Sequence, residues 1–242
     1  MSNYLGRIAV VSLTIGVVSL GLAWMFGGRD LGQLLHRGTL FARSCGDGGK
    51  GADTERHLPW RGNSIDIALP GTVHFRAGEG SDIVVRGAPD TIANVEVRGG
   101  RLMLDCPWTA EARNIEVTLP GQTTRHVGIS GSGKLEMDNL NQRDLTLSIS
   151  GSGSLRAQGT VDHLRVRVSG SGDAQLGALV AKRLNVEVSG SGNVEASPQD
   201  DANIRIAGSG NVRLLTRPAR LQTHIAGSGR ISQPQEAAEG KK

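Results

Sequence analysis

The C-terminal half of the chain alternates apolar and polar residues in short segments, and the same segment recurs at a nearly fixed period. Every copy carries a Gly-Ser-Gly corner, and the corners begin at Gly131, Gly151, Gly170, Gly190, Gly208 and Gly227, in steps of 20, 19, 20, 18 and 19 residues. A period of this size is typical of a solenoid, in which each unit is one coil that buries its apolar face against its neighbours. The pattern therefore predicts an all-β fold, a single-stranded parallel β-helix with about six coils of 18–20 residues.

Alignment of the copies on the first glycine of each corner gives three columns that are almost wholly aliphatic. Two residues before the glycine stand Ile129, Ile149, Val168, Val188, Ile206 and Ile225; four before it stand Val127, Leu147, Val166, Val186, Ile204 and Thr223; four after it stand Leu135, Leu155, Ala174, Val194, Val212 and Ile231. Successive side chains of a strand point to opposite faces, so these columns are the inward positions of the coils. We predict that Ile149, Val168, Val188 and Ile206 form one buried stack.

The corners themselves combine small residues with glycine. The residue before each corner is Ser or Ala, which lets successive coils stack at about 4.8 Å without a clash. Glycine on both sides of the corner serine permits positive φ and a tight turn. We therefore assign a structural role in the turns to Gly131, Gly133, Gly151, Gly153, Gly170, Gly172, Gly190, Gly192, Gly208, Gly210, Gly227 and Gly229.

Short strands with the same alternation precede the repeats. They are expected at Ser64–Leu69, Thr72–Ala77, Asp82–Arg86, Ile92–Val97, Arg101–Asp105 and Asn114–Leu119, with Gly- and Pro-containing turns between them. These patterns divide the domain into an N-terminal β region over residues 58–125, the Gly-Ser-Gly repeats over 126–233 and a charged tail over 234–242.

The first residues of the chain follow a different pattern. Ile8–Gly28 contains no charge, and about 20 apolar residues suffice to cross the hydrocarbon core of a bilayer. The run exceeds the apolar core of about 7–15 residues of a secretory signal, and it ends in bulky residues, so we predict a transmembrane helix as the N-terminal membrane anchor within residues 1–28. A cleaved signal is the alternative. Residues 29–57 then form a flexible juxtamembrane linker.

The orientation of this span rests on two opposing features. Arg7 precedes it, whereas Arg29, Arg37 and Arg43 follow it, and this distribution by itself would hold the C-terminal side in the cytoplasm. Long C-terminal domains are translocated largely regardless of such charges. We therefore predict an inner-membrane anchor with the domain exported to the periplasm of a bacterial cell envelope.

Cys45 and Cys106 are the only cysteines. In an oxidising compartment they could pair and tie the linker to the domain, which makes them a candidate disulfide. Two unrelated thiols are an equally good interpretation of the sequence.

Composition and spacing argue against several kinds of site. The formal net charge is +4, but acidic and basic residues are interspersed, so no nucleic-acid-binding surface is predicted. The histidines and cysteines lack zinc-ligand spacing, and the corners lack the recurrent aspartate of calcium-binding β-rolls. No nucleophile-elbow motif of a serine hydrolase occurs. We predict no metal, no cofactor and no catalytic residue.

The polar columns of the repeats are the remaining candidates for binding. Arg167, Glu187 and Arg205 stand three residues before successive corners and form the candidate binding face. A second polar column, five residues after the corners, contains Glu136, Arg156, Glu195 and Arg213. Exposed pairs of opposite charge contribute only about 0–1 kcal/mol each, so these columns can equally serve register and solubility. Trp60 and Trp108 precede the repeats and are interpreted as core or capping residues.

Three of these features together resemble a known family. They are the strand–turn–strand segment Ile65–Phe75, the NIEVTLPG strand at Asn114–Gly121, and the six corners. Over about Ser64–Ile231 the chain resembles the putative auto-transporter adhesin head GIN domain family. The resemblance implies a right-handed parallel β-helix in a cell-envelope protein, and it brings no catalytic residues.

The sequence thus predicts a non-enzymatic, membrane-anchored envelope protein whose exported β-helix is a binding or adhesion module. Its expected partners are the membrane, through the N-terminal helix, and an envelope polysaccharide or protein. One alternative is a structural scaffold in which coils associate end to end with weak self-association. A weaker alternative is a polysaccharide-acting enzyme. A scaffold needs solenoid ends whose terminal strands are free to pair with another molecule. The charged, Pro-containing tail over 234–242 instead favours a capped C-terminal end.

Overall fold

The computed structural model of the chain describes residues 53–76, 82–106, 115–120 and 124–235. The predicted anchor within residues 1–28, Cys45 and Trp108 lie outside the described residues. Within those four ranges, no helix is long and apolar enough to cross a membrane. The account that follows concerns the unit that begins at Ser44.

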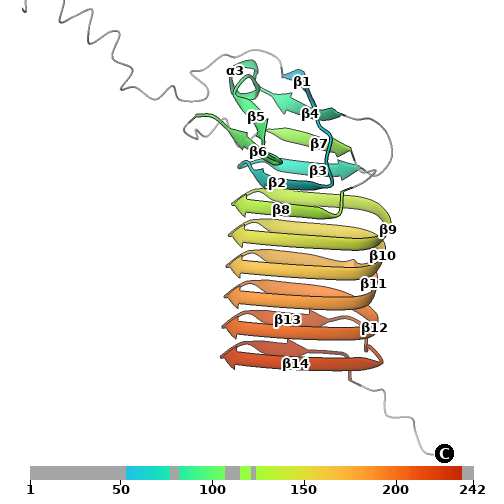
Figure 1. The fold of residues 1–242 in the computed structure, drawn as a ribbon. Coiled ribbons are helices and arrows are strands. Elements are labelled where there is room, and N and C mark those ends of the chain that lie inside the picture. Colours follow the sequence, from blue (N-terminus) through green and yellow to red (C-terminus); the bar gives the residue numbers. More distant parts are fainter. Residues whose placement is uncertain (1–52, 77–81, 107–114, 121–123, 236–242) are drawn as a thin grey trace, which may run out of the picture. The chain divides into compact units, whose positions relative to one another are not determined.

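The repeats fold into a β-solenoid of about five turns. Its strands are β8 (His126–Gly131), β9 (Lys134–Gly151), β10 (Ser154–Gly170), β11 (Asp173–Gly190), β12 (Asn193–Gly208), β13 (Asn211–Leu214), β14 (Arg220–Gly227) and β15 (Arg230–Ser232). Neighbouring coils pair in parallel along the whole stack (Figure 1). The expected number of about six coils is one too many, because six corners bound five complete intervals.

Each coil contributes two strand segments, which lie in two layers (Figure 1). The segment after a corner pairs with the segment after the next corner, as Leu135 does with Leu155, and we call this the post-corner layer. The segment before a corner pairs in the same way, as Ile149 does with Val168, and we call this the pre-corner layer. The apolar side chains of both layers meet inside the coil and form the core.

The predicted buried stack is confirmed. Ile149, Val168, Val188 and Ile206 stand in register on β9 to β12, and each has at most 1% of its surface exposed. The column ends at the last coil, where Ile225 is 41% exposed. Inward position alone therefore does not bury a side chain, because a coil also has to be covered by its neighbour.

The first glycine of every corner adopts a backbone conformation that L-residues rarely reach. Its φ lies between +101° and +134° at Gly131, Gly151, Gly170, Gly190, Gly208 and Gly227. A Cβ atom at Gly190 would also lie 2.4 Å from the carbonyl oxygen of Gly170 on the coil before it. The corner thus requires glycine for its turn and for the close approach of successive coils.

The N-terminal region adds coils out of chain order. Its elements are β1 (Thr54–Pro59), β2 (Ser64–Ala68), β3 (Thr72–Arg76), β4 (Asp82–Gly87), α3 (Pro89–Ile92), β5 (Val95–Arg98), β6 (Arg101–Leu104) and β7 (Glu116–Pro120). Strands β2 and β3 stack directly on β8 and β9, whereas β6 and β7 stack on the far side of β2 and β3. The alternation predicted most of these strands, but it predicted neither β1, nor α3, nor this order.

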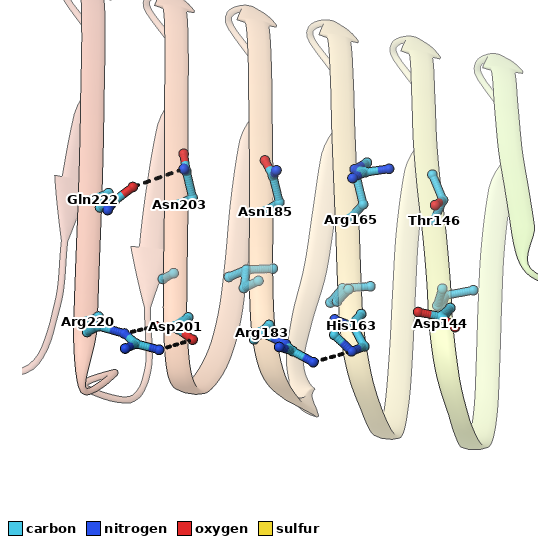
Figure 2. Close-up of a pocket in the computed structure, with 14 residues that line it drawn as sticks. Asp144, Thr146, His163, Arg165, Arg183, Asn185, Asp201, Asn203, Arg220 and Gln222 are labelled. Carbon is cyan, nitrogen blue, oxygen red and sulfur yellow. Dashed lines mark hydrogen bonds and ion pairs between the residues drawn. The ribbon is translucent and has the colours of Figure 1, made fainter.

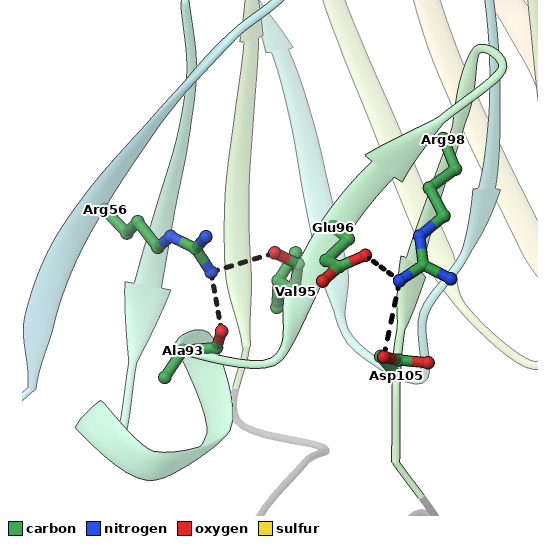
Figure 3. A network of polar contacts seen from close by, with 6 residues as sticks. All are labelled: Arg56, Ala93, Val95, Glu96, Arg98 and Asp105. Carbon is green, nitrogen blue, oxygen red and sulfur yellow. Dashed lines mark hydrogen bonds and ion pairs between the residues drawn. The ribbon is translucent and has the colours of Figure 1, made fainter.

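Antiparallel strands close the N-terminal end of the solenoid. β4 runs antiparallel to β7, β1 to β4, and β5 to β6. The Arg56 guanidinium on β1 donates hydrogen bonds to the carbonyl oxygens of Ile92, Ala93 and Val95 at 2.9, 2.8 and 2.9 Å, which fastens β1 to α3 and β5 (Figure 3). Arg98 contacts Glu96 at 2.6 Å and Asp105 at 3.4 Å beside it.

Candidate functional site

A groove of about 520 Å³ crosses the outer face of the pre-corner layer, from β9 to β14 (Figure 2). Two rows of side chains line it. The charged row, seven residues before the corners, consists of Asp144, His163, Arg183, Asp201 and Arg220, and the amide row, five residues before them, consists of Thr146, Arg165, Asn185, Asn203 and Gln222. Leu145, Leu164 and Leu184 stand between the rows and are buried in the core. The alternation therefore places both rows on the solvent side.

The charged row contains one ion pair and one further hydrogen bond between neighbouring coils. Arg220 forms a two-pronged ion pair with Asp201, in which Nη2 donates to Oδ2 at 2.8 Å. This hydrogen bond holds the pKa of Asp201 below its ordinary value and raises the pKa of Arg220. Arg183 Nη2 donates to Nε2 of His163 on the coil before it (Figure 2). Asp201 stays ionised at neutral pH and neutralises Arg220.

The amide row contains an unpaired positive charge on its second coil. Arg165 on β10 is exposed, and its guanidinium makes no hydrogen bond or ion pair to any other described residue. The side chains of Thr146 and Asn185 flank it on the neighbouring coils and are likewise without a side-chain partner among the described residues. Further along the row, Asn203 donates to Gln222 at 3.3 Å. The part of the groove over β9 to β11 therefore offers a cation and uncharged polar groups to solvent.

The predicted binding face lies in the same layer, beside this groove. Arg167, Glu187 and Arg205 stand in register on β10, β11 and β12, so the structure brings the three residues side by side. Arg167 is 3.6 Å from Glu187, whereas Arg205 has no ion-pair partner in the described part of the chain. Their role in binding stays a prediction. The sequence analysis missed the two rows of the groove, although their polar character recurs before every corner from Gly151 on.

The second polar column lies on the post-corner layer and is internally paired. Glu136 contacts Lys134 at 2.6 Å, Glu195 contacts Arg213 at 3.7 Å, and Arg156 donates to Gln175 at 2.7 Å. The hydrogen bond from Lys134 holds the pKa of Glu136 below its usual range. These groups satisfy one another, so the column is a poorer candidate for ligand contacts than the groove.

A hollow of about 460 Å³ lies further along the same layer, over β11, β12, β13 and β15. An asparagine ladder runs through it. Asn193 donates to Asp173 at 2.8 Å and Asn211 donates to Asn193 at 3.0 Å. The ladder connects successive coils. These polar residues therefore fix the register of the coils and stabilise the stack, and no ligand is needed to account for them.

Other residues singled out in the sequence lie away from the groove. Trp60 is partly buried and packs against the core, as does Cys106. The pairing of Cys106 with Cys45 stays a prediction, because Cys45 is outside the described ranges. Among the residues with described positions, no cluster of three or more His, Cys, Asp or Glu could hold a metal ion.

Comparison with known proteins gives a family and a fold. The family model described as "Putative auto-transporter adhesin, head GIN domain" matches residues 63–218. The solved structure of a putative adhesin from Bacteroides fragilis NCTC 9343 has 16% identity and a TM-score of 0.62, over 76% of this chain and 97% of that chain. This likeness supports the solenoid fold and says nothing of a ligand.

A second solved structure has a weaker likeness. It is a putative lipid binding protein from Parabacteroides distasonis ATCC 8503, with 17% identity and a TM-score of 0.47, over 77% of this chain and 98% of that chain. None of the curated proteins matches the chain significantly. The family match, which covers more than half of the chain, is therefore the main result of the comparisons.

Proposed function

The chain belongs to the putative auto-transporter adhesin, head GIN domain family, and on this premise we propose that its solenoid is an envelope binding module for anionic polysaccharide. The ligand lies across the coils of the pre-corner layer, in the groove and beside it. Arg165 and Arg205 supply two positive charges that make no ion pair with another described residue, and Thr146 and Asn185 supply hydrogen bonds to hydroxyl groups.

The observation that carries this proposal is the unpaired Arg165 in the groove. Several other cationic side chains of the repeats, such as Arg167, Lys182 and Arg220, meet a carboxylate on a neighbouring coil, whereas Arg165 does not. Polar groups recur along the layer at the coil spacing of about 4.8 Å, which suits an extended polymer. Each exposed contact is weak, so affinity has to come from several contacts to one chain.

The carboxylates of the groove favour binding over hydrolysis. Asp144 lies on β9 and Asp201 on β12, so they are three coil spacings apart, or about 14 Å. Glycoside hydrolysis by paired carboxylates requires a separation of roughly 5–9.5 Å. Asp201 is in addition engaged by Arg220. The groove is therefore suited to hold a sugar polymer rather than to cleave it.

Replacing Arg165 and Arg205 together by Ser should weaken the binding of polygalacturonate by about tenfold or more, because two charge-assisted contacts are lost. The measurement is biolayer interferometry on immobilised polygalacturonate, with neutral dextran as the uncharged reference. Arg213→Ser is the matched control, since Arg213 lies on the other layer and already pairs with Glu195. Wild-type binding should also fall steeply with added salt, because screening shortens the range of exposed charges.

Asp201→Asn tests the same site in the opposite direction. The substitution removes the carboxylate that neutralises Arg220, so a third cation becomes available and binding of polygalacturonate should strengthen several-fold. Equal binding of the double variant, Asp201→Asn and wild type would remove the groove from the proposal. Release of reducing ends from the polymer by the purified chain would replace binding with catalysis.

We further propose that the domain is exported and held at the inner membrane by the apolar run Ile8–Gly28. The full-length protein should fractionate with membranes, and protease added to spheroplasts should remove the solenoid. Cytoplasmic expression without the first 28 residues provides the protected control. A soluble periplasmic form that begins near Gly27 would replace the anchor with a cleaved signal.

A further inference from the structure

The last coil of the solenoid exposes apolar side chains at positions that are buried in every coil before it. Ile225 is 41% exposed and Leu221 36%, whereas their register partners Ile206 and Ala202 are 1% and 3% exposed. All eight residues of β14 are exposed. Apolar side chains that stay exposed to water in a row commonly indicate an interaction surface, because burying them against a partner is favourable.

This coil also ends both layers with a free strand edge. β14 pairs with β12 alone and β15 pairs with β13 alone, so within the described part of the chain their outer backbone groups have no strand partner. We name β14 and β15 together the C-terminal edge. Unpaired strand edges are templates for the addition of another strand. The partner therefore has to bring backbone hydrogen bonds as well as apolar side chains.

We propose that a second copy of this chain covers the C-terminal edge, so that two solenoids meet tail to tail. The edge presents Leu221 and Ile225 on one layer and Ile231 on the other. A single added strand would cover one layer and leave the other in water. The end of another solenoid matches both layers at the same time.

The two ends of the molecule decide which end of the second copy fits. At the N-terminal end, β4 covers β7 and β5 covers β6, and Arg56 fastens β1 to the carbonyls of Ala93 and Val95 (Figure 3). The apolar side chains there, such as Ile83 and Val95, are fully buried. Among the described residues, β1 and β5 at the N-terminal end also have one strand partner each, but only the C-terminal end exposes its inward apolar side chains, so the contact joins two identical surfaces about a two-fold axis and closes at a dimer. It cannot propagate as a filament.

The sequence of β14 is self-complementary in an antiparallel pairing centred on Thr223. In this register Leu221 faces Ile225 of the other copy, and Gln222 faces His224. Thr223 faces its own equivalent, and it is the one polar residue of an otherwise aliphatic column. Threonine pairs directly opposite one another form favourable cross-strand contacts.

The charges of the edge are compatible with this register. Arg220 faces Ala226 of the other copy, and the two copies of Arg220 stand six residues apart along the ladder, at about 20 Å. Arg220 is also neutralised by Asp201 within its own chain. No like charges are therefore brought together at the centre of the contact.

The first experiment measures the mass of the full-length chain in mild detergent by sedimentation equilibrium over a range of concentrations. We expect a dimer whose dissociation constant rises about a hundredfold in Ile225→Lys, because each copy loses a buried apolar side chain. Ala178→Lys adds the same charge at an exposed position on β11 and should leave the dimer unchanged. Circular dichroism should report the same fold for all three proteins, since Ile225 is exposed in the single chain.

The second experiment tests the register. Thr223→Cys should form a disulfide between copies under mild oxidation, because residues directly opposite on antiparallel strands have Cβ atoms about 4.5–5.5 Å apart. Ala226→Cys, three positions from the centre, should not form it, and the wild type gives the background of the native cysteines.

A chain that stays monomeric at all concentrations would overturn the proposal, whatever else covers the edge. A dimer that survives Ile225→Lys would overturn it as well, because its interface would lie elsewhere. The polygalacturonate assay is independent of both outcomes, since Arg165 lies on the outer face of β10 and not at the edge.

Discussion

Replacing Val188 by Asp should unfold the solenoid at room temperature. Val188 is fully buried on β11, and its neighbours in the stack are Val168 and Ile206. An unpaired carboxylate at this position has no hydrogen-bond partner and costs several kcal/mol, and the apolar contacts of valine are lost as well. The sum is comparable to the whole stability of an ordinary domain, about 5–15 kcal/mol.

The measurement is thermal and urea unfolding followed by circular dichroism. Ala178→Asp is the matched control, because it adds the same charge at an exposed position of the same strand. It should shift the melting temperature by only a few degrees. If Val188→Asp melted like Ala178→Asp, the assignment of this column to the interior would be wrong.

The interior of the repeats could be predicted because it depends on one local rule. Alternation decides which face a side chain occupies, and the fixed period decides which side chains meet on neighbouring coils. Val168 and Val188 therefore had to stack once the corners were aligned. The same rule failed at Ile225, because burial there requires a further coil and not merely an inward position.

The N-terminal region departs from the sequence prediction for a different reason. Its strand pattern does not say which strand stacks on which, and β6 and β7 lie beyond β2 and β3 although they follow them in the chain. Strand β1 (Thr54–Pro59) begins within the expected linker over residues 29–57 and crosses its boundary. It is held by a contact that the alternation does not encode, the hydrogen bonds from Arg56 to α3 and β5. Ile92, the first residue of the expected strand Ile92–Val97, is instead the last residue of the short helix α3. Pro89 stands in the first turn of this helix, where proline is favoured.

The candidate groove was hidden in the sequence by the regularity of the polar columns. The sequence shows where the cations and carboxylates stand along the chain. Whether a given cation stays unpaired depends on which partners the neighbouring cations bind. Arg220 pairs with Asp201, and Arg183 donates a hydrogen bond to His163, whereas Arg165 has no partner among the described side chains. Such pairings depend on rotamers and cross-coil register, so the sequence could locate the layer and not the site.

Replacing Gly190 by Ala should destabilise the solenoid by about 3 kcal/mol or more, although it adds only one methyl group. The residue has φ of +124°, and an added Cβ would lie 2.4 Å from the carbonyl oxygen of Gly170. The oxygen belongs to the backbone and the position of the Cβ is fixed by the backbone, and both strands are held in a parallel ladder, so relief requires two coils to separate locally. Backbone strain of this kind alone costs about 1–3 kcal/mol, and the steric contact adds to it.

Gly99→Ala separates these two causes. Gly99 also has a positive φ, of +58°, but a Cβ there would meet nothing within 4 Å, so its substitution should cost only about 1–2 kcal/mol from the left-handed conformation. Urea unfolding of the two variants measures the difference directly. Equal losses would mean that the coils yield to the extra methyl group. A much larger loss at Gly190 would mean that contact between successive backbones, rather than turn conformation, is the main reason for glycine at the start of every corner.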